Sequence, residues 1–208
     1  SAVTTRLRIA TGICLLPERD PLVLAKQVAS LDYFSGGRFI FGIGAGWLRE
    51  ETEIMGGDFD HRWTQAKESV MAMKALWAEA ESEFHGKYYD FPPVHSFPKP
   101  AQRPHPPVIL AGTAANVHKR IADWGDGWLP IRISPEEVRA GREKLNALAA
   151  ASGRDPAGLT ISIYGVLPEP ETVRAYADAG ADRVVLRLDS SPEAETLVTL
   201  KELAKKLF

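Results

Sequence analysis

The sequence predicts an α/β fold built from repeated strand–helix units. Short runs rich in β-branched and aromatic residues alternate with amphipathic segments of helical period along most of the 208 residues. This alternation is typical of parallel βα units. A chain of this length with 45% hydrophobic residues can bury one sizeable core, so we expect a single domain over residues 1–208.

The first third of the chain contains two expected strands and one helix. Residues 7–14 and 38–44 are apolar and β-rich, which predicts the strands. The helix is expected over about residues 20–35, because Asp20 can cap its start and Gly36 can end it.

A longer helix and an irregular segment follow. Asp60 is the expected N-cap of the helix. The apolar stripe of this helix contains Trp63, Ala66, Val70, Met73 and Trp77. Seven prolines lie between Pro92 and Pro107, which no regular helix or central strand tolerates, so residues 84–107 are expected to cross the surface.

The alternation then resumes with four more strands, each followed by a helix. The strands are expected at residues 107–112, 127–131, 159–165 and 182–188, and the helices at 114–124, 135–151, 170–179 and 192–207. Six βα units suit either an open doubly wound sheet or most of a (β/α)8 barrel, and periodicity does not separate these folds. The glycines at 42, 44 and 46 lack the GxGxxG spacing, which disfavours a dinucleotide-binding doubly wound fold.

Composition excludes several classes of partner. The 25 Lys and Arg residues nearly balance 27 Asp and Glu residues, without runs of one sign, so neither nucleic acid nor a membrane surface is an expected partner. Cys14 is the only cysteine, so no internal disulfide can form. Without an apolar stretch of ~20 residues or a signal peptide, we expect a cytoplasmic protein.

Two strand ends are candidate ligand sites. At the first, backbone amides of Gly44, Ala45, Gly46 and Trp47 can approach a planar cofactor; alternatively, the glycines only permit close packing. At the second, Gly112 and Thr113 precede a helix whose N-terminal amides can bind phosphate, with Asn116 one turn further on. Alternatively, Thr113 only caps that helix.

Other candidates have simpler explanations. Cys14 is expected to be a buried apolar residue rather than a nucleophile. Glu50 and Glu51 are either an acid–base pair or solvated carboxylates. Trp128 in "GDGW" either packs in the core or contacts substrate. The five histidines show no metal-ligand spacing, so no metal site is expected.

Four segments together resemble the luciferase-like monooxygenase superfamily, and within it the coenzyme F420-dependent oxidoreductases of actinobacteria. They are "TRLRIATGICLLPERDPLVLAKQVASLDYFSGGRFIFGIGAGWLREE", "FHGKYYDF", "PPVILAG" and "GDGW". The resemblance implies a (β/α)8 TIM-barrel type fold with an insertion, usually a homodimer, that binds a flavin or deazaflavin at the C-terminal face of the barrel. The six expected strands then correspond to the third to eighth of the family.

By this resemblance the first two βα units are missing, since Ser1 corresponds to the end of the second helix. The chain is then a fragment, a mis-started or processed product, or a shortened member that closes differently or with a partner. The histidine and tryptophan with which several relatives catalyse the reaction belong to those missing strands. No catalytic acid or base can therefore be assigned.

The resemblance also implies individual cofactor contacts. Gly12 and Ile13 match a non-proline cis peptide that lies behind the cofactor's central ring. Gly112, Thr113 and Asn116 match the positions that hold the flavin phosphate, and residues 45–47 match a backbone segment near the same cofactor. Trp47 stands where the sugar-phosphate dehydrogenases of the superfamily carry a glutamate, so that activity is not expected.

The expected function is hydride transfer between coenzyme F420 and a small organic substrate. The first alternative is an FMN-dependent luciferase-like monooxygenase. The second is a non-catalytic truncated homologue that binds a cofactor or a partner.

Overall fold

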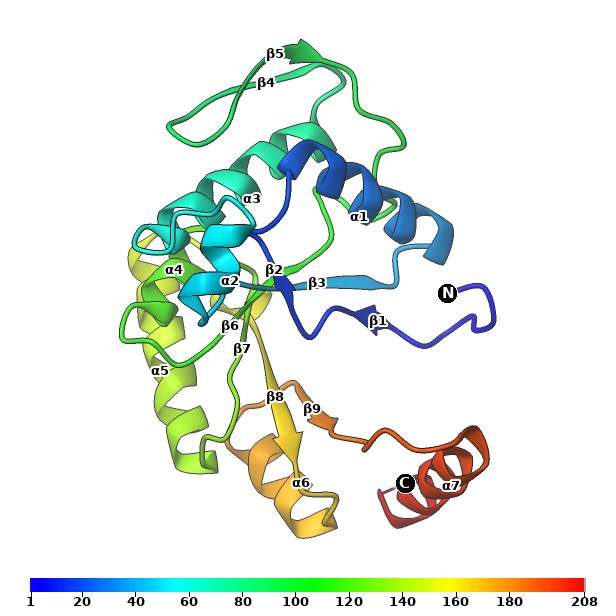
Figure 1. Ribbon diagram of the computed structural model, residues 1–208. Helices are drawn as coiled ribbons and strands as arrows, with labels where there is room; N and C mark the ends of the chain where they lie inside the picture. The colour runs from blue at the N-terminus through cyan, green and yellow to red at the C-terminus, as the bar shows by residue number, and fades with distance from the viewer. Residues whose placement is uncertain (208) are drawn as a thin grey trace. The chain divides into compact units, whose positions relative to one another are not determined.

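The computed structural model describes residues 1–207, which divide into two compact units. The first unit is Ser1–Ile109, and the second covers the described residues from Leu110 onward, 110–207. Figure 1 shows that strands and helices alternate along the chain, as the sequence predicts. The assignment of a single domain over residues 1–208 stays a prediction.

The strands of the first unit pair in parallel around β3 (Phe39–Gly44), whose residues are all buried. Both β1 (Ile9–Ala10) and β2 (Cys14–Leu15) pair with it. The prediction of one continuous strand over residues 7–14 is therefore wrong. Ala10 is opposite Ile40 and Cys14 is opposite Ile43, so three residues stand against two and the chain bulges.

Helix α1 (Pro21–Ser35) has the predicted ends. The Asp20 carboxylate accepts hydrogen bonds from the amides of Leu22 and Val23, at 2.9 and 3.0 Å. Gly36 ends the helix in the left-handed conformation, with φ of 69°. Local capping signals were sufficient here because each bond joins residues close in sequence.

Helix α3 (Arg62–Ala78) begins after His61, not after Asp60 as predicted. The reason is long-range, because the Asp60 carboxylate is held in an ion pair with Arg49. Arg49 begins α2 (Arg49–Ile54), a helix that the sequence did not predict. The predicted stripe of α3 is buried except at Trp63, which is half-buried.

Trp77 joins three elements of the core of the first unit. It is 1% exposed, and its ring meets Phe41 of β3 edge-on with a 6.2 Å separation of ring centroids. Its indole Nε1 donates a hydrogen bond to the carbonyl of Ala25 in α1, at 2.9 Å. In Figure 1, α1 and α3 accordingly lie side by side over β3.

The proline-rich segment is more regular than predicted. Its first part is an antiparallel hairpin of β4 (Ser82–His85) and β5 (Asp90–Val94). Each strand of a two-stranded hairpin is an edge strand, which is why prolines are tolerated in β5. The Tyr88 hydroxyl donates to Asp58 at 2.9 Å, which attaches the hairpin to the loop before α3.

The strands of the second unit are also parallel. The chain runs through β6 (Val108–Ala111) into this unit, where the Gly112 amide donates to the Leu129 carbonyl at 3.2 Å. Strand β7 (Gly127–Leu129) pairs with β8 (Thr160–Val166), and β8 pairs with β9 (Arg183–Leu186). The predicted strands are confirmed: β6, β7 and β9 are shorter than predicted, and β8 has the predicted length but begins and ends one residue later.

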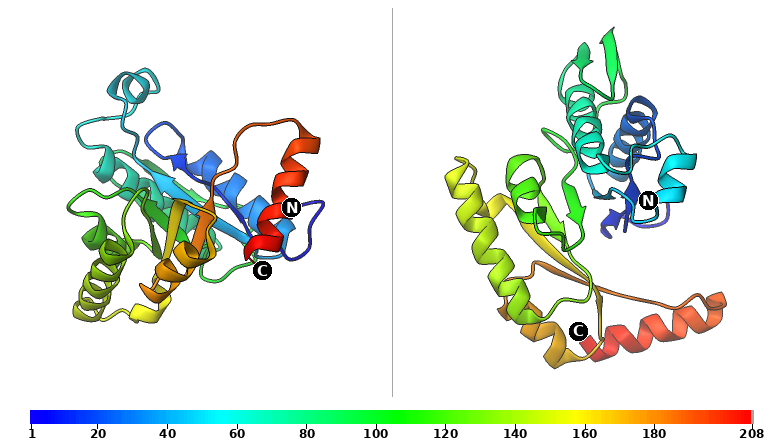
Figure 2. Two further views of the ribbon diagram at one scale, coloured as in Figure 1. Left: turned by 90° about the horizontal axis from the view of Figure 1, so that it is seen from below. Right: turned by 60° about the vertical axis from the view of Figure 1, so that its left-hand side comes forward.

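Four α-helices accompany these strands. They are α4 (Val117–Trp124), α5 (Pro135–Ala151), α6 (Pro170–Asp178) and α7 (Glu193–Leu207), with the short 3-10 helix η1 (Pro156–Gly158) before β8. Helix α5 begins with a capping box between Ser134 and Glu137. Figure 2 shows α4 beside the long α5, and α7 contains no buried residue among those described.

Candidate functional site

In the first unit, the bulge between β1 and β2 lies against the end of β3. The Gly12–Ile13 peptide bond is cis, as the resemblance predicts. The Ile13 side chain lies over Gly44, since a Cβ atom on Gly44 would be 2.1 Å from its Cδ1. A side chain at position 44 would therefore displace the end of the Ile13 side chain.

The segment after Gly44 changes from buried to exposed within three residues. Ala45 is 3% exposed, Gly46 has a φ of 82°, and Trp47 is 82% exposed. In this unit the structure thus brings together Gly12 and Ile13 with the 44–47 segment. Gly12 and Ile13 lie between the carboxyl end of β1 and the start of β2, and the 44–47 segment begins at the carboxyl end of β3, the end at which ligands of parallel α/β proteins bind.

Glu18 is a half-buried residue beside this segment, with a buried carboxylate oxygen, that the sequence did not single out. Its Oε1 has no hydrogen-bond partner within residues 1–207 and would lie 3.5 Å from a Cβ on Gly46. Burial, together with the charge of Glu51, raises the pKa of this carboxyl above its usual value. No sequence signal indicates this burial, because Glu18 stands in an ordinary loop between β2 and α1.

Cys14 and the pair Glu50 and Glu51 have structural rather than catalytic roles in this unit. Cys14 is 7% exposed, and burial raises the pKa of its thiol despite the opposing charge of Arg19. It is therefore a buried thiol rather than an activated nucleophile. Glu50 and Glu51 are exposed in the first turn of α2, where carboxylates favour the helix.

In the second unit, the predicted phosphate-binding residues form a loop, residues 112–116, between β6 and α4. Gly112 has a φ of 102°. Asn116 is the N-cap residue of α4 but makes no side-chain capping bond. Thr113 does not cap α4 either, so the helix begins without a side-chain cap.

The amides of this loop are available to a ligand. Thr113, Ala114, Ala115 and Asn116 are exposed, and across residues 1–207 no protein acceptor receives a hydrogen bond from their amides. Consecutive unpaired amides at the start of a helix favour an anion such as phosphate. The structure brings Gly112, Thr113 and Asn116 together as the sequence predicts.

Trp128 lies in β7 and is 3% exposed, which confirms the packing role over substrate contact. It also makes a bond that the sequence did not predict: its indole Nε1 donates to the Gly112 carbonyl at 2.7 Å. The His118 ring meets the indole edge-on, with ring centroids 4.5 Å apart.

Replacing His118 with glutamine is expected to reduce the amount by which the free energy of unfolding falls at acidic pH. Burial, together with Lys144, lowers the pKa of His118, so the neutral ring is favoured in the folded chain. The unfolded chain then takes up the proton first, and stability falls as pH drops through the ordinary histidine pKa of ~6.5. Urea unfolding of wild type and H118Q at about pH 7.5 and about pH 5.5 measures the difference.

A control for this prediction is His85, whose pKa is raised by its hydrogen bond to Asp90. Its contribution has the opposite sign, because it is present at acidic pH and is lost as pH rises through the folded pKa. His85→Gln is therefore expected to leave the acid-induced loss intact or increase it. Equal losses in H118Q and wild type would contradict the prediction.

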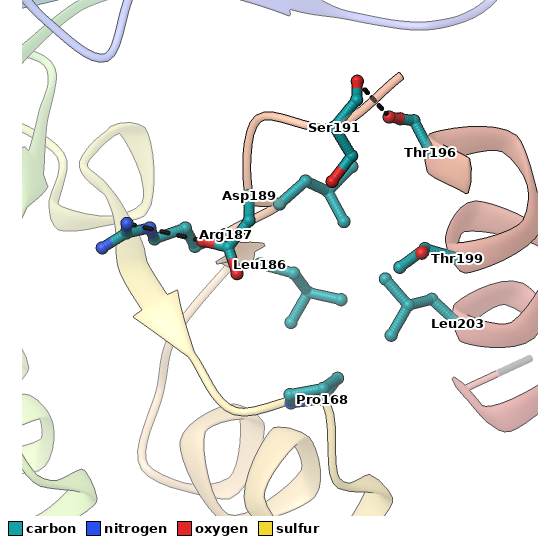
Figure 3. A pocket seen from close by; sticks show the side chains of 9 residues that line it. Pro168, Leu186, Arg187, Asp189, Ser191, Thr196, Thr199 and Leu203 are labelled. Carbon is teal, nitrogen blue, oxygen red and sulfur yellow. Dashed lines mark hydrogen bonds and ion pairs between the residues drawn. The ribbon is translucent and has the colours of Figure 1, made fainter. Parts of the chain in front are cut away.

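A separate pocket of about 230 Å³ lies in the second unit, between β9, the loop that follows it and α7. Figure 3 shows Leu186 and Leu203 facing each other across it, whereas the Arg187 side chain points away. None of the predicted cofactor residues lines this pocket. It is therefore distinct from the 112–116 loop.

Among the described residues, no three His, Cys, Asp or Glu side chains are grouped as metal ligands, and no helix is long and apolar enough to cross a membrane.

Comparisons with known proteins place these elements in context. Residues 1–200 match the family model described as luciferase-like monooxygenase. An uncharacterized protein of Mycobacterium tuberculosis is 36% identical over 211 aligned positions, which cover 100% of this chain and 73% of that protein. An FMNH2-dependent dimethylsulfone monooxygenase of Pseudomonas putida is 32% identical over 158 positions, which cover 73% of this chain and 42% of the relative.

A solved structure confirms the fold class. An F420-dependent secondary alcohol dehydrogenase, solved with an F420–acetone adduct, has a TM-score of 0.80 at 18% identity. The alignment covers 100% of this chain and 81% of the dehydrogenase chain. The relatives are longer than the 208 residues here. The fold is therefore a partial TIM-like barrel with six parallel strand positions, counting β1 and β2 as one.

Proposed function

Since this chain belongs to the luciferase-like monooxygenase family of flavin- or F420-dependent oxidoreductases, we propose that it transfers hydride between coenzyme F420 and a small organic substrate. The choice of F420 rests on the motifs that resemble the actinobacterial F420-dependent enzymes. A neighbour of the same fold that is solved with an F420 adduct is consistent with it.

The observation that carries the proposal is the set of unpaired amides at Thr113, Ala114, Ala115 and Asn116. Both F420 and FMN carry a phosphate. Four exposed N–H donors at the uncapped start of α4 fit such a group, because the partial positive charge of the helix start adds to their hydrogen bonds.

The first unit fits a planar ring. Gly44 and Gly46 leave the backbone at the end of β3 without side chains, and Ile13 presents an apolar, 38% exposed side chain beside them. Apolar surface of this kind orients an aromatic ring and excludes water from it. When bound, F420 supplies hydride transfer at its C5 atom. We assign no catalytic acid or base.

The alternative function is FMN-dependent oxygenation of a small substrate. The observation that favours it is the 32% identity with the FMNH2-dependent monooxygenase of Pseudomonas putida. The amides of the 112–116 loop fit the phosphate of FMN equally well, so the two functions differ in the ring that binds and not in the phosphate contact.

Titration of the purified chain with F420 and, separately, with FMN distinguishes these functions by fluorescence. We expect saturable binding of F420 at lower concentration than FMN. Tighter binding of FMN would replace the leading function with the alternative. If a folded chain binds neither, both enzymatic functions fail and the non-catalytic homologue is the remaining explanation.

We also propose that the protein acts in the cytoplasm as a homodimer. Support for the dimer comes from apolar side chains on the outer face of α1, where Val23 is 59% exposed and Phe34 is 77% exposed. Exposed apolar groups on one helix face are typical of an interface. Light scattering is expected to give twice the 22.8 kDa chain mass, and a monomer at micromolar concentration would contradict the dimer.

A further inference from the structure

We propose that Trp128 is a positioning residue for the cofactor phosphate, acting through the 112–116 loop. This inference rests on the proposed function, because it concerns the same phosphate contact. Trp128 does not touch the phosphate. Its indole holds the loop in the conformation that leaves the four amides unpaired.

Strand β7 holds Gly112 through both its carbonyl and its amide. Its carbonyl accepts from the indole Nε1 of Trp128 at 2.7 Å, and its amide donates to the carbonyl of Leu129 at 3.2 Å. Both partners belong to β7. Gly112 has a φ of 102°, a conformation at which the chain turns as it leaves β6. The two bonds hold Gly112 in this conformation.

The Trp128 indole contacts both ends of the segment that carries the unpaired amides. It bonds Gly112 at the start, and it packs against the His118 ring in the first turn of α4, with an angle of 64° between the rings. The unpaired amides lie between these two contacts. A displacement of the indole therefore changes the loop at both ends.

The Trp128 indole is tightly packed. Trp128 is 3% exposed, and it packs directly on Gly141 of α5. A Cβ atom on Gly141 would lie 2.3 Å from Cζ3 of the indole and 3.1 Å from Nε2 of His118. Gly141 thus lets α5 press the indole toward the loop.

Low exposure excludes direct contact between Trp128 and a substrate. Two roles remain, namely packing alone and packing combined with control of the loop. They differ in the importance of the indole N–H, because phenylalanine replaces most of the apolar volume but cannot donate to Gly112. The variant W128F therefore separates them.

The experiment compares W128F with W77F. Trp77 is a matched control, since it is 1% exposed and its Nε1 also donates to a backbone carbonyl, that of Ala25 at 2.9 Å, in the other unit. Isothermal titration calorimetry gives the affinity for each cofactor and for its phosphate-free form. The pairs are FMN with riboflavin, which differ only in the phosphate, and F420 with the deazaflavin alcohol, which lacks the phosphate together with the tail attached to it.

For wild type we expect the phosphate-bearing form to bind more tightly. We call the ratio of the two affinities, with and without phosphate, the phosphate advantage. In W128F the phosphate advantage is expected to fall about tenfold, while the affinity for the phosphate-free form stays unchanged. In W77F the advantage is expected to stay at the wild-type value, although its stability falls by a similar amount. An undiminished advantage in a folded W128F protein would overturn the inference.

A second variant keeps the test decisive if W128F does not fold. Gly141→Ala retains the indole N–H but displaces the ring, so the same loss of phosphate advantage is expected. Retention of the full advantage in G141A would then overturn the inference. If wild type itself shows no phosphate advantage, the phosphate site of the proposed function fails, which is a different result from failure of the role of Trp128.

Discussion

Replacing Asp32 with alanine is expected to lower the free energy of unfolding by about 3 kcal/mol, because two hydrogen bonds to a buried carboxylate are lost together. Asp32 is 0% exposed. Its two carboxylate oxygens accept from the main-chain amide and the side-chain amide of Gln102, at 2.8 and 2.7 Å. Alanine would leave the Gln102 main-chain amide and one N–H of its side-chain amide without these acceptors, and would leave a cavity beside α1.

Urea unfolding monitored by far-UV circular dichroism measures this loss. Asp32→Asn is the control, since its side-chain oxygen can still accept one of the two bonds, so a smaller loss is expected. Gln102 also donates to the Phe39 carbonyl at 2.7 Å, a bond that does not involve Asp32, so D32A detaches Gln102 from α1 but leaves its bond to β3. A change of under about 1 kcal/mol in D32A would contradict the prediction.

Replacing Gly127 with alanine is expected to destabilise the chain by at least about 2 kcal/mol through overpacking. Gly127 is buried in β7 and stands opposite Thr160 of β8. A Cβ atom on Gly127 would lie 2.5 Å from the Thr160 carbonyl oxygen and 2.6 Å from its Oγ1. The carbonyl belongs to the backbone of a paired strand, so only separation of β7 and β8 removes the clash.

Gly158→Ala is the matched control for G127A. Gly158 lies in η1, shortly before β8, and no atom lies within 4 Å of a Cβ added to it. Its backbone is not left-handed, so alanine is expected to be neutral or to stabilise by up to ~1 kcal/mol through the unfolded chain. Similar midpoints for G127A and G158A in urea unfolding would show that β7 and β8 separate at no cost.

The two substitutions differ in their expected effect on the proposed site. Gly127 precedes Trp128, so a shift of β7 also moves the indole that bonds Gly112. G127A is therefore expected to weaken the phosphate advantage as well as stability. D32A changes only the first unit and is expected to leave the contacts of the 112–116 loop unchanged.

Elements whose ends depend on neighbouring residues were predictable from the sequence. The Asp20 cap and the left-handed Gly36 define α1 within one residue of the prediction. Helix α5 has exactly the expected bounds, Pro135–Ala151. In both cases the deciding bonds join residues no more than about four positions apart, and such bonds follow from local sequence.

Elements that depend on distant contacts were not predictable. Helix α3 begins after His61, and the Asp60 carboxylate that the sequence predicts as its cap is instead paired with Arg49, eleven positions away. The break between β1 and β2 depends on their register against β3, which no feature of residues 7–14 specifies. The hairpin depends on Tyr88 bonding Asp58, thirty positions away.

By itself, the sequence determined that this is a chain of six parallel βα units with luciferase-like motifs, and it located the residues of the 44–47 and 112–116 segments. Alternation, helix caps and glycine positions are local properties, so they can be recognised in order along the chain. Only the tertiary structure decided that one carboxylate oxygen of Glu18 is buried, that Thr113 leaves α4 uncapped, and that Trp128 bonds Gly112. Each of these facts depends on which distant groups fill the space around a side chain, and that is settled only when the strands and helices pack together.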